Sequence, residues 1–524
     1  MKSVFYSALK ISKMGCVMAI MLFGSLLNGR QAVAQDTLSK YILTPKPGPA
    51  PQINGPKVFG VRPGHPVLFT IPATGVRPMT FTATNLPKGV KLDSETGRLS
   101  GRIEKPGDYQ VTLTAKNKIG KTSRPFKICV GETIALTPPM GWNSWNIYAS
   151  KVTQDLVLAN AKVMAKSGLI DHGWSYMYID DVWQGKRGGK YHAIMPDSTS
   201  FPDMQSLVDN VHNLGLKIGI YSTPWTESYG HHVGGSSMNP EGTFTPVKEN
   251  IPRNKKLLPY KIGDYVFVNN DVKQYATWGF DYIKYDWNPI EYPETKLMYD
   301  ALRASGRDIV FSLSNSTPFN SIGELSTVSN CWRTGGDIRD EWKSLKSRLF
   351  TQDKWAPYAK PGHWNDPDMM VVGYVGWGKG IRPTKLTADE QYTHMSAWCL
   401  MSVPLLLGCD LTKLDDFTLS LLTNDEVIAL NQDPLGKQAT VISNQGEAGV
   451  MAKDLEDGSK AVGLFNPGDS GVQKVVVKWS DLGIKGKYIV RDLWRQKDLG
   501  TFDGEFSANV NVHGVVLVTL RKAK

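Results

Sequence analysis

The chain is poor in cysteine. Its 524 residues include only five cysteines, and Cys16 belongs to an N-terminal leader described below. The other four show no C-x-x-C spacing; they are Cys129, Cys331, Cys399 and Cys409. Such scattered cysteines are not typical of a disulfide framework or a zinc site. We therefore predict mainly buried thiols, no bound metal and no cofactor.

Runs of basic residues and long apolar runs are also missing. The formal net charge is +11, but the lysines and arginines are spread along the chain, without a block that would favour binding to nucleic acid. No segment after the leader is long and apolar enough to cross a bilayer. The sequence therefore predicts no nucleic-acid partner and no membrane span.

The first residues have the pattern of a secretory signal. Lysines precede the short apolar run Cys16–Leu27, and Ala32-Val33-Ala34 matches an A-x-A cleavage site. This order of basic, apolar and small residues is typical of a signal peptide. We predict that residues 1–34 are removed and that the protein is exported, to the periplasm or beyond the cell.

The outer parts of the mature chain have all-β patterns. Prolines at every second position from Pro45 to Pro51 indicate an extended linker over residues 35–54. Short strand patterns such as Tyr109–Ala115 follow over residues 55–131, which resemble the immunoglobulin-like modules of bacterial secreted enzymes. Residues 436–524 are again all-β, with buried runs such as Lys474–Trp479. The sequence predicts a β-sandwich at each end of the mature chain.

Residues 132–435 alternate strand patterns with amphipathic helix patterns. Eight such repeats in about 300 residues are typical of a (β/α)8 TIM barrel. The eight expected strands are Met140–Trp145, Tyr176–Asp181, Lys217–Ser222, Tyr282–Trp287, Ile309–Ser314, Asn330–Thr334, Gly362–Met369 and Pro404–Leu411.

Polar and aromatic side chains gather where these strands end. In a barrel of parallel strands the carboxyl ends meet on one face, which is where catalysis is built. Aromatic rings can stack on sugars, and a pair of carboxylates can cleave a glycosidic bond. The residues brought to this face are Trp145, Asp180, Asp181, Tyr221, Lys284, Asp286, Arg333 and Asp337. Together they indicate a glycosidase.

Several motifs make the interpretation more specific. They include Met140-Gly141-Trp142-Asn143-Ser144-Trp145, Tyr178-Ile179-Asp180-Asp181, Lys284-Tyr285-Asp286, Cys331-Trp332-Arg333 and Trp364-Asn365-Asp366-Pro367-Asp368. In this order they resemble the α-galactosidase and α-N-acetylgalactosaminidase family, glycoside hydrolase family 27. The resemblance implies a retaining exo-glycosidase that removes terminal α-linked galactose from oligo- or polysaccharides.

The resemblance also implies roles for individual residues. Asp286 would be the nucleophile and Asp337 the general acid and base. Asp180 and Asp181 would bind the 4- and 6-hydroxyls of galactose, and Lys284 the 3-hydroxyl. Near the 2-position we expect Arg333; Trp145 would form a wall, and Tyr221 would lie beside the nucleophile.

The chain departs from the family pattern at strand five. Ser314 stands where galactosidases carry a glutamate that reads the 2-hydroxyl, and Asn315–Phe319 match neither branch of the family. Trp287 replaces a cysteine that often follows the nucleophile, so we predict that the family's active-site disulfide is absent. An α-N-acetylgalactosaminidase is therefore the alternative activity.

Two rivals from other classes remain. The aromatic strand ends would equally suit an inactive carbohydrate-binding relative, although such a protein need not keep both carboxylates. A metal-dependent barrel hydrolase would need histidine ligands, and His231-His232 is the only close histidine pair.

Overall fold

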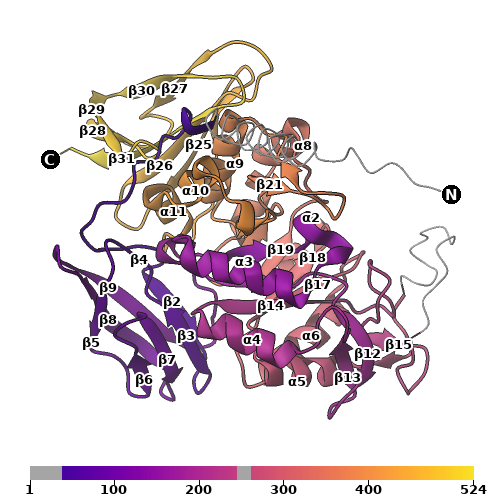
Figure 1. Ribbon diagram of the computed structural model, residues 1–524. Coiled ribbons are helices and arrows are strands. Elements are labelled where there is room, and N and C mark those ends of the chain that lie inside the picture. Colours follow the sequence, from indigo (N-terminus) through magenta and orange to yellow (C-terminus); the bar gives the residue numbers. More distant parts are fainter. Residues whose placement is uncertain (1–37, 245–260, 524) are drawn as a thin grey trace, which may run out of the picture.

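The chain folds into two β-sandwiches packed against a central barrel (Figure 1). The computed structural model describes residues 38–244 and 261–523. The predicted signal peptide lies outside the described residues. None of the helices within those residues is long and apolar enough to cross a membrane.

The N-terminal module is the predicted immunoglobulin-like sandwich. Its core holds Phe81, Leu113 and Phe126 between two sheets. One sheet has the order β2-β9-β8-β5 and the other β3-β7-β6. The strands are β2 (Val58–Val61), β3 (Pro66–Thr70), β5 (Thr80–Thr84), β6 (Val90–Leu92), β7 (Arg98–Arg102), β8 (Gly107–Lys116) and β9 (Lys121–Val130). A short pairing of β1 (Gln52–Ile53) with β4 (Ala73–Thr74) starts the module inside the range we assigned to the linker.

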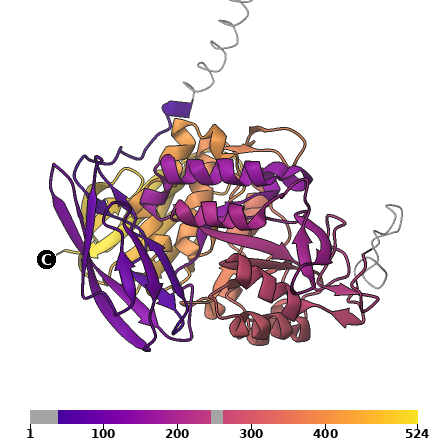
Figure 2. The same ribbon diagram turned by 60° about the horizontal axis from the view of Figure 1, so that its bottom comes forward.

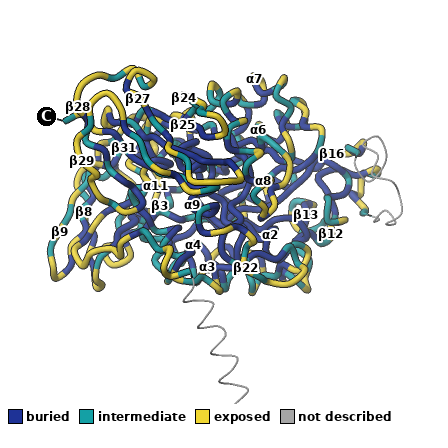
Figure 3. The backbone as a smooth tube through the Cα atoms, turned by 90° about the horizontal axis from the view of Figure 1, so that it is seen from above, coloured by how far each residue is buried: buried dark blue, intermediate teal, exposed yellow. Residues whose placement is uncertain are grey.

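The barrel has the eight predicted strands, all parallel. Their order is β20-β19-β18-β17-β14-β11-β10-β23, and Met370 closes the ring by pairing with Leu407. Their bounds are β10 (Met140–Asn143), β11 (Tyr176–Tyr178), β14 (Lys217–Ser222), β17 (Tyr282–Asp286), β18 (Val310–Ser314), β19 (Cys331–Arg333), β20 (Trp364–Asp366) and β23 (Leu405–Leu407). The predicted barrel is confirmed, and its strands are largely buried. The buried residues, drawn in dark blue, gather in the middle of the molecule (Figure 3).

Helices cover the barrel, and most of them have one apolar face; α9 (Ala388–Met401) is buried along almost its whole length. Their apolar faces pack on the strands and form one continuous core with them. The main helices are α3 (Gln154–Lys166), α4 (Met204–Asn213), α5 (Val268–Trp278), α6 (Tyr292–Ala304), α8 (Trp342–Leu349), α9 (Ala388–Met401), α10 (Asp416–Leu422) and α11 (Asp425–Asn431).

The C-terminal sandwich packs on helix α9. Its antiparallel six-stranded sheet has the order β24-β25-β26-β31-β28-β29, and β27 pairs with β30. These strands are β24 (Thr440–Gln445), β25 (Ala448–Asp454), β26 (Lys460–Phe465), β27 (Gln473–Lys478), β28 (Lys487–Asp492), β29 (Lys497–Asp503), β30 (Glu505–Val510) and β31 (Val515–Lys522). A Cβ atom on Gly463 would lie 2.6 Å from the Leu400 side chain, so glycine permits this close packing.

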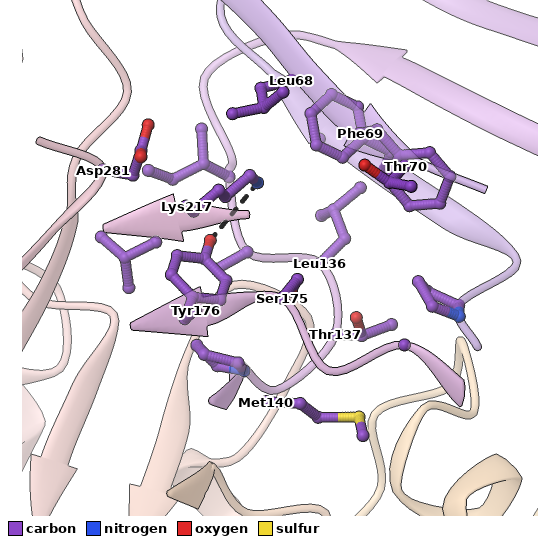
Figure 4. Close-up of a pocket in the computed structure, with 18 of the residues that line it drawn as sticks. Leu68, Phe69, Thr70, Leu136, Thr137, Met140, Ser175, Tyr176, Lys217 and Asp281 are labelled. Carbon is purple, nitrogen blue, oxygen red and sulfur yellow. Dashed lines mark hydrogen bonds between the residues drawn. The ribbon is translucent and has the colours of Figure 1, made fainter. Parts of the chain in front are cut away.

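The N-terminal module packs beside the barrel (Figure 2). It contacts the amino ends of the barrel strands, opposite the face formed by their carboxyl ends. Arg62 forms an ion pair of 2.7 Å with Asp308, which lies just before β18, and Thr70 donates to the carbonyl of Gly215, just before β14. Between the two domains lies a cavity of about 110 Å³, into which Lys217 and Tyr176 extend from the barrel (Figure 4). The module therefore covers the base of the barrel.

Candidate active site

The strand ends place Asp286 at the centre of the carboxyl-end face. Asp286 is the last residue of β17 and is paired in register with Ser314 of β18. Lys284 lies two residues earlier in the strand and therefore on the same face, with its ammonium 3.5 Å from Oδ2 of Asp286. The Asp286 side chain is only 9% exposed. It is thus a buried carboxylate with a cation beside it.

Asp337 follows strand β19 and is more open to solvent. Its side chain is 60% exposed, and its Oδ1 lies 3.2 Å from a guanidinium nitrogen of Arg333, the last residue of β19. The other end of that guanidinium lies 3.0 Å from Asp368. Because Arg333 is held by Asp368, it can fix the position of Asp337. A solvent-facing carboxyl is well placed to exchange protons.

A second pair of carboxylates, Asp180 and Asp181, follows β11, which is separated from β17 by β14. The Lys284 ammonium bridges to Oδ2 of Asp180 at 2.9 Å, and the Asn143 amide donates to the same oxygen at 2.8 Å. Asp181 accepts hydrogen bonds from the Gln184 amide and from the backbone N–H of Gly230, at 2.6 Å. Lys284 therefore ties Asp180 to Asp286 in one cluster.

Tyr221 and Trp145 complete the predicted set. Tyr221 is buried in β14, and the Lys284 ammonium lies 5.6 Å from the centre of its ring. Its hydroxyl has no hydrogen-bond partner among the described residues. Trp145 begins the short helix α2 (Trp145–Tyr148) directly after β10 and is half-buried. An unpaired buried hydroxyl beside two carboxylates is available to bind a polar ligand.

The end of strand β18 (Val310–Ser314) carries the predicted Ser314 and, directly after it, Asn315, for which no contact with the nucleophile was predicted. Ser314 is 2% exposed and lines a small internal cavity beneath the site, together with Lys284 and Arg333. Asn315, the next residue, donates from its amide to Oδ1 of Asp286 at 2.9 Å. A polar residue directly after a strand end next to the nucleophile strand was the available signal. Asn315 therefore contacts the candidate nucleophile, whereas Ser314 lies below it.

Asp366 and Asp368 support the site from β20 and the loop after it. Asp368 binds Arg333 and also accepts from the backbone N–H of Ile338, at 2.7 Å, in the loop that carries Asp337. Burial raises the pKa of Asp366 to about 6, and Asp366 accepts from the backbone N–H of Asp368. Both carboxylates therefore act on Arg333 and its loop.

The candidate metal ligands are engaged elsewhere. His231 lies 2.6 Å from Glu227, and a ring nitrogen of His232 lies 2.9 Å from the carbonyl of Gln184. In residues 38–244 and 261–523, no group of three or more His, Cys, Asp and Glu side chains could hold a metal ion. The four cysteines described are free thiols, three of them buried.

The two candidate catalytic carboxyls have pKa values shifted in opposite directions. Burial raises the pKa of Asp286 to about 7, although the charge of Lys284 opposes the shift. Burial also pushes the pKa of Asp337 upward, but Arg333 and Lys284 outweigh it, so this pKa is lowered. Between these two values the free pair holds one proton, the state that a nucleophile and an acid share in retaining glycosidases.

We expect a bell-shaped pH dependence of kcat/KM for this reason. Activity should fall above about pH 7, where the pair loses its proton. It should fall again only below the ordinary pKa of an aspartate, where Asp337 is protonated as well and the pair holds two protons. Initial rates at low substrate concentration across pH 3–10 would measure both limbs. An alkaline limb above about pH 9 would contradict the proton sharing.

Fold and site together define a class of protein. A parallel barrel carries two carboxylates at the carboxyl ends of β17 and β19, with further carboxylates, cations and aromatic rings around them. This is the arrangement of a barrel glycosidase that uses two acids.

Comparisons with known proteins identify the family. A family model for alpha galactosidase A matches residues 137–238 and 256–433, a model for the alpha galactosidase C-terminal β-sandwich matches 445–520, and an Ig domain model matches 50–131. The chain belongs to the α-galactosidase family, glycoside hydrolase family 27.

Three relatives show how far the similarity extends. A probable alpha-galactosidase of Dictyostelium discoideum is 36% identical over 400 residues, which are 74% of this chain and 93% of the relative. A Bacteroides fragilis structure, provisionally assigned as an α-galactosidase/melibiase, is 32% identical with a TM-score of 0.80, and the match covers 92% of this chain and all of that one. A β-L-arabinopyranosidase of this family from Geobacillus stearothermophilus is 30% identical with a TM-score of 0.64, over 74% of this chain and 97% of that one.

Proposed function

We propose that the protein is a retaining exo-α-galactosidase. The observation that carries the proposal is the cluster in which Lys284 joins Asp286 to Asp180 while Arg333 positions Asp337. It provides one buried and one solvent-facing carboxyl, as a nucleophile and an acid require. Family membership and the α-galactosidase relatives support galactose as the sugar.

The reaction proceeds in two displacements. In the first, a carboxylate oxygen of Asp286 forms a bond to the anomeric carbon as the glycosidic bond breaks, and Asp337 donates its proton to the departing oxygen. In the second, Asp337 takes a proton from water, whose oxygen attacks the same carbon and releases Asp286. Two inversions give net retention of configuration.

The pair must redistribute its proton to start this cycle. The directions of the two pKa shifts favour the proton on Asp286 in the free protein. Catalysis needs it on Asp337. The galactosyl ester then removes the negative charge of Asp286, which lowers the pKa of Asp337 further and favours its action as a base.

The two carboxylates that follow β11 suit the axial 4-hydroxyl and the primary 6-hydroxyl of galactose. Asp180 is held by Lys284 and Asn143, and Asp181 by Gln184 and Gly230, so both acceptors are rigid. Burial raises the pKa of Asp181 because it removes water from the carboxylate. A bound hydroxyl would supply a hydrogen bond in place of that water. We propose that they bind the 4- and 6-hydroxyls, and that the N-terminal leader exports the protein.

The group at the 2-position of the sugar, a hydroxyl or an acetamido group, distinguishes the two family activities. Asn315 touches Asp286, so it lies within reach of groups next to the anomeric carbon and fills part of the space that Ser314 would leave open. We expect kcat/KM for nitrophenyl α-galactoside to exceed that for the N-acetylated counterpart by at least about tenfold, because a crowded pocket rejects the larger acetamido group.

A panel of nitrophenyl glycosides that differ only in the sugar measures this preference. It should include the β-L-arabinopyranoside, which lacks the group that Asp181 is proposed to bind. A ratio in favour of the N-acetyl sugar would overturn the proposal and would mean that Ser314 leaves room for the acetamido group. No cleavage of any substrate would favour the inactive carbohydrate-binding alternative.

A further inference from the structure

The rim of the site beside Asp337 carries an arginine on an aromatic ring. Arg339 lies two residues after Asp337 in the same loop, and its guanidinium carbon is 5.5 Å from the centre of the Trp377 ring. Trp377 follows β21 (Tyr374–Val375), and its backbone N–H donates to the carbonyl of Asn146 at 3.0 Å. The backbone of Trp377 is therefore anchored to helix α2 at Asn146, the residue after Trp145.

Two arginines lie over the Trp377 ring, and they differ in whether a carboxylate binds them. Arg382 also lies over Trp377, at 6.0 Å, but both oxygens of Asp340 bind it, at 2.5 and 3.1 Å. Arg339 has no carboxylate within 4.0 Å in the part of the chain that the structure describes. Its backbone N–H is fixed by Ser344 Oγ at 2.9 Å. The rim thus holds one guanidinium without an anionic partner.

Arg339 belongs to the loop of the proposed acid, and the leaving group departs beside that acid. Asp337 donates its proton to the oxygen between galactose and the next unit, so groups on the solvent side of Asp337 meet that unit. The charge of Arg339 acts on Asp337 directly, as one of the causes that lower the pKa of this carboxyl. A guanidinium held in this place by an aromatic ring can bind a carboxylate of the ligand through two parallel hydrogen bonds.

We propose that Arg339, held on Trp377, forms a leaving-group subsite for an acidic sugar, a uronic acid linked to the terminal galactose. The proposal rests on the proposed galactosidase activity and adds a preference for the unit that is released. Arg382, neutralised by Asp340, contributes to the shape of this subsite and adds no free charge.

The test compares two disaccharides with the wild-type protein. Galactose α-linked to glucuronic acid should be cleaved with a kcat/KM about tenfold above that for galactose α-linked to glucose, the lower range for a charge-assisted pair open to water. Added salt at about 0.5 M should reduce this ratio, because the pair is exposed. The methyl ester of the acidic disaccharide should lose the advantage.

Variants assign the preference to this residue. In Arg339→Met the ratio of acidic to neutral substrate should fall to about one, and Trp377→Ala should reduce it in part. Lys385→Met is the matched control: this rim lysine pairs with Glu341 at 3.0 Å, and its loss should leave the ratio unchanged. A ratio retained in Arg339→Met would overturn the proposal.

The outcomes separate this proposal from the activity on which it rests. Cleavage of nitrophenyl α-galactoside with no preference for the acidic disaccharide would refute the subsite and leave the galactosidase standing. A sulfated disaccharide preferred over the uronic acid would show that the subsite binds anions of another kind, contrary to the carboxylate proposed. No cleavage of any galactoside would refute the activity itself.

Discussion

Asp286→Ala should fold and lose nearly all turnover, by about four orders of magnitude or more. The carboxylate of Asp286 is the proposed nucleophile, and without it no ester to the anomeric carbon can form. The remaining cluster has Lys284 bound to Asp180, so the pocket keeps its shape and should still bind sugar. Steady-state rates with nitrophenyl α-galactoside measure the loss.

Azide gives this experiment its sharper form. In Asp286→Gly a small anion can occupy the vacated space and attack the anomeric carbon once, so the product should be the glycosyl azide of inverted configuration. Asp366→Asn is a matched control, because Asp366 is also buried with a raised pKa but acts on Arg333. It should give no azide product. Turnover like the wild type in Asp286→Ala would end the nucleophile assignment.

Replacing Asp286 by asparagine should also change the stability of the fold in a pH-dependent way. Burial raises the pKa of Asp286 to about 7, so the folded state keeps this proton at pH values where the unfolded chain, with a pKa near 4, has lost it. Stability therefore decreases as pH rises between these two values. At pH 8 the free energy of unfolding of Asp286→Asn should exceed that of the wild type by up to about 4 kcal/mol, and its melting temperature should be higher. Near pH 4 the two proteins should differ little.

Local patterns were enough to predict the barrel. Most of the strands are short, largely apolar runs that end in a polar or aromatic residue, and parallel pairing then brings these ends together; Asp286 and Arg333 follow from that rule. The three-domain architecture was predicted for the same reason, because strand spacing and helix periodicity are local properties.

Contacts between distant segments could not be predicted in this way. Arg62 binds Asp308 across 246 positions of sequence, and nothing near either residue shows that the N-terminal module covers the base of the barrel. The contact of Asn315 with Asp286 and that of Arg339 with Trp377 likewise depend on how loops fold over the strand ends. Side-chain placement in loops is a property of the folded molecule.

Asp337→Ala should divide substrates by the quality of their leaving group. A sugar is a poor leaving group and needs a proton from Asp337, whereas dinitrophenolate departs without one. We expect a loss of about 10²–10⁴-fold on disaccharides and a much smaller loss on the first displacement with dinitrophenyl α-galactoside. Presteady-state rates should show a burst with the activated substrate, because the galactosyl enzyme then accumulates.

Asp340 is the carboxylate that could be confused with Asp337, and the structure explains why the two differ. The Asp340 side chain is 4% exposed and is bound by Arg382, and it also accepts from the backbone N–H of Lys385 at 2.9 Å. Its pKa is lowered: burial opposes the shift, but the bond to Arg382 outweighs it, and the pKa of Asp337 is lowered as well; the two carboxyls differ in their exposure to solvent. Asp337, 60% exposed and paired with Arg333, can both give and take a proton. Asp340→Asn should therefore leave the ratio between disaccharide and dinitrophenyl substrates near its wild-type value, and equal losses on both substrates in Asp337→Ala would assign the acid to another residue.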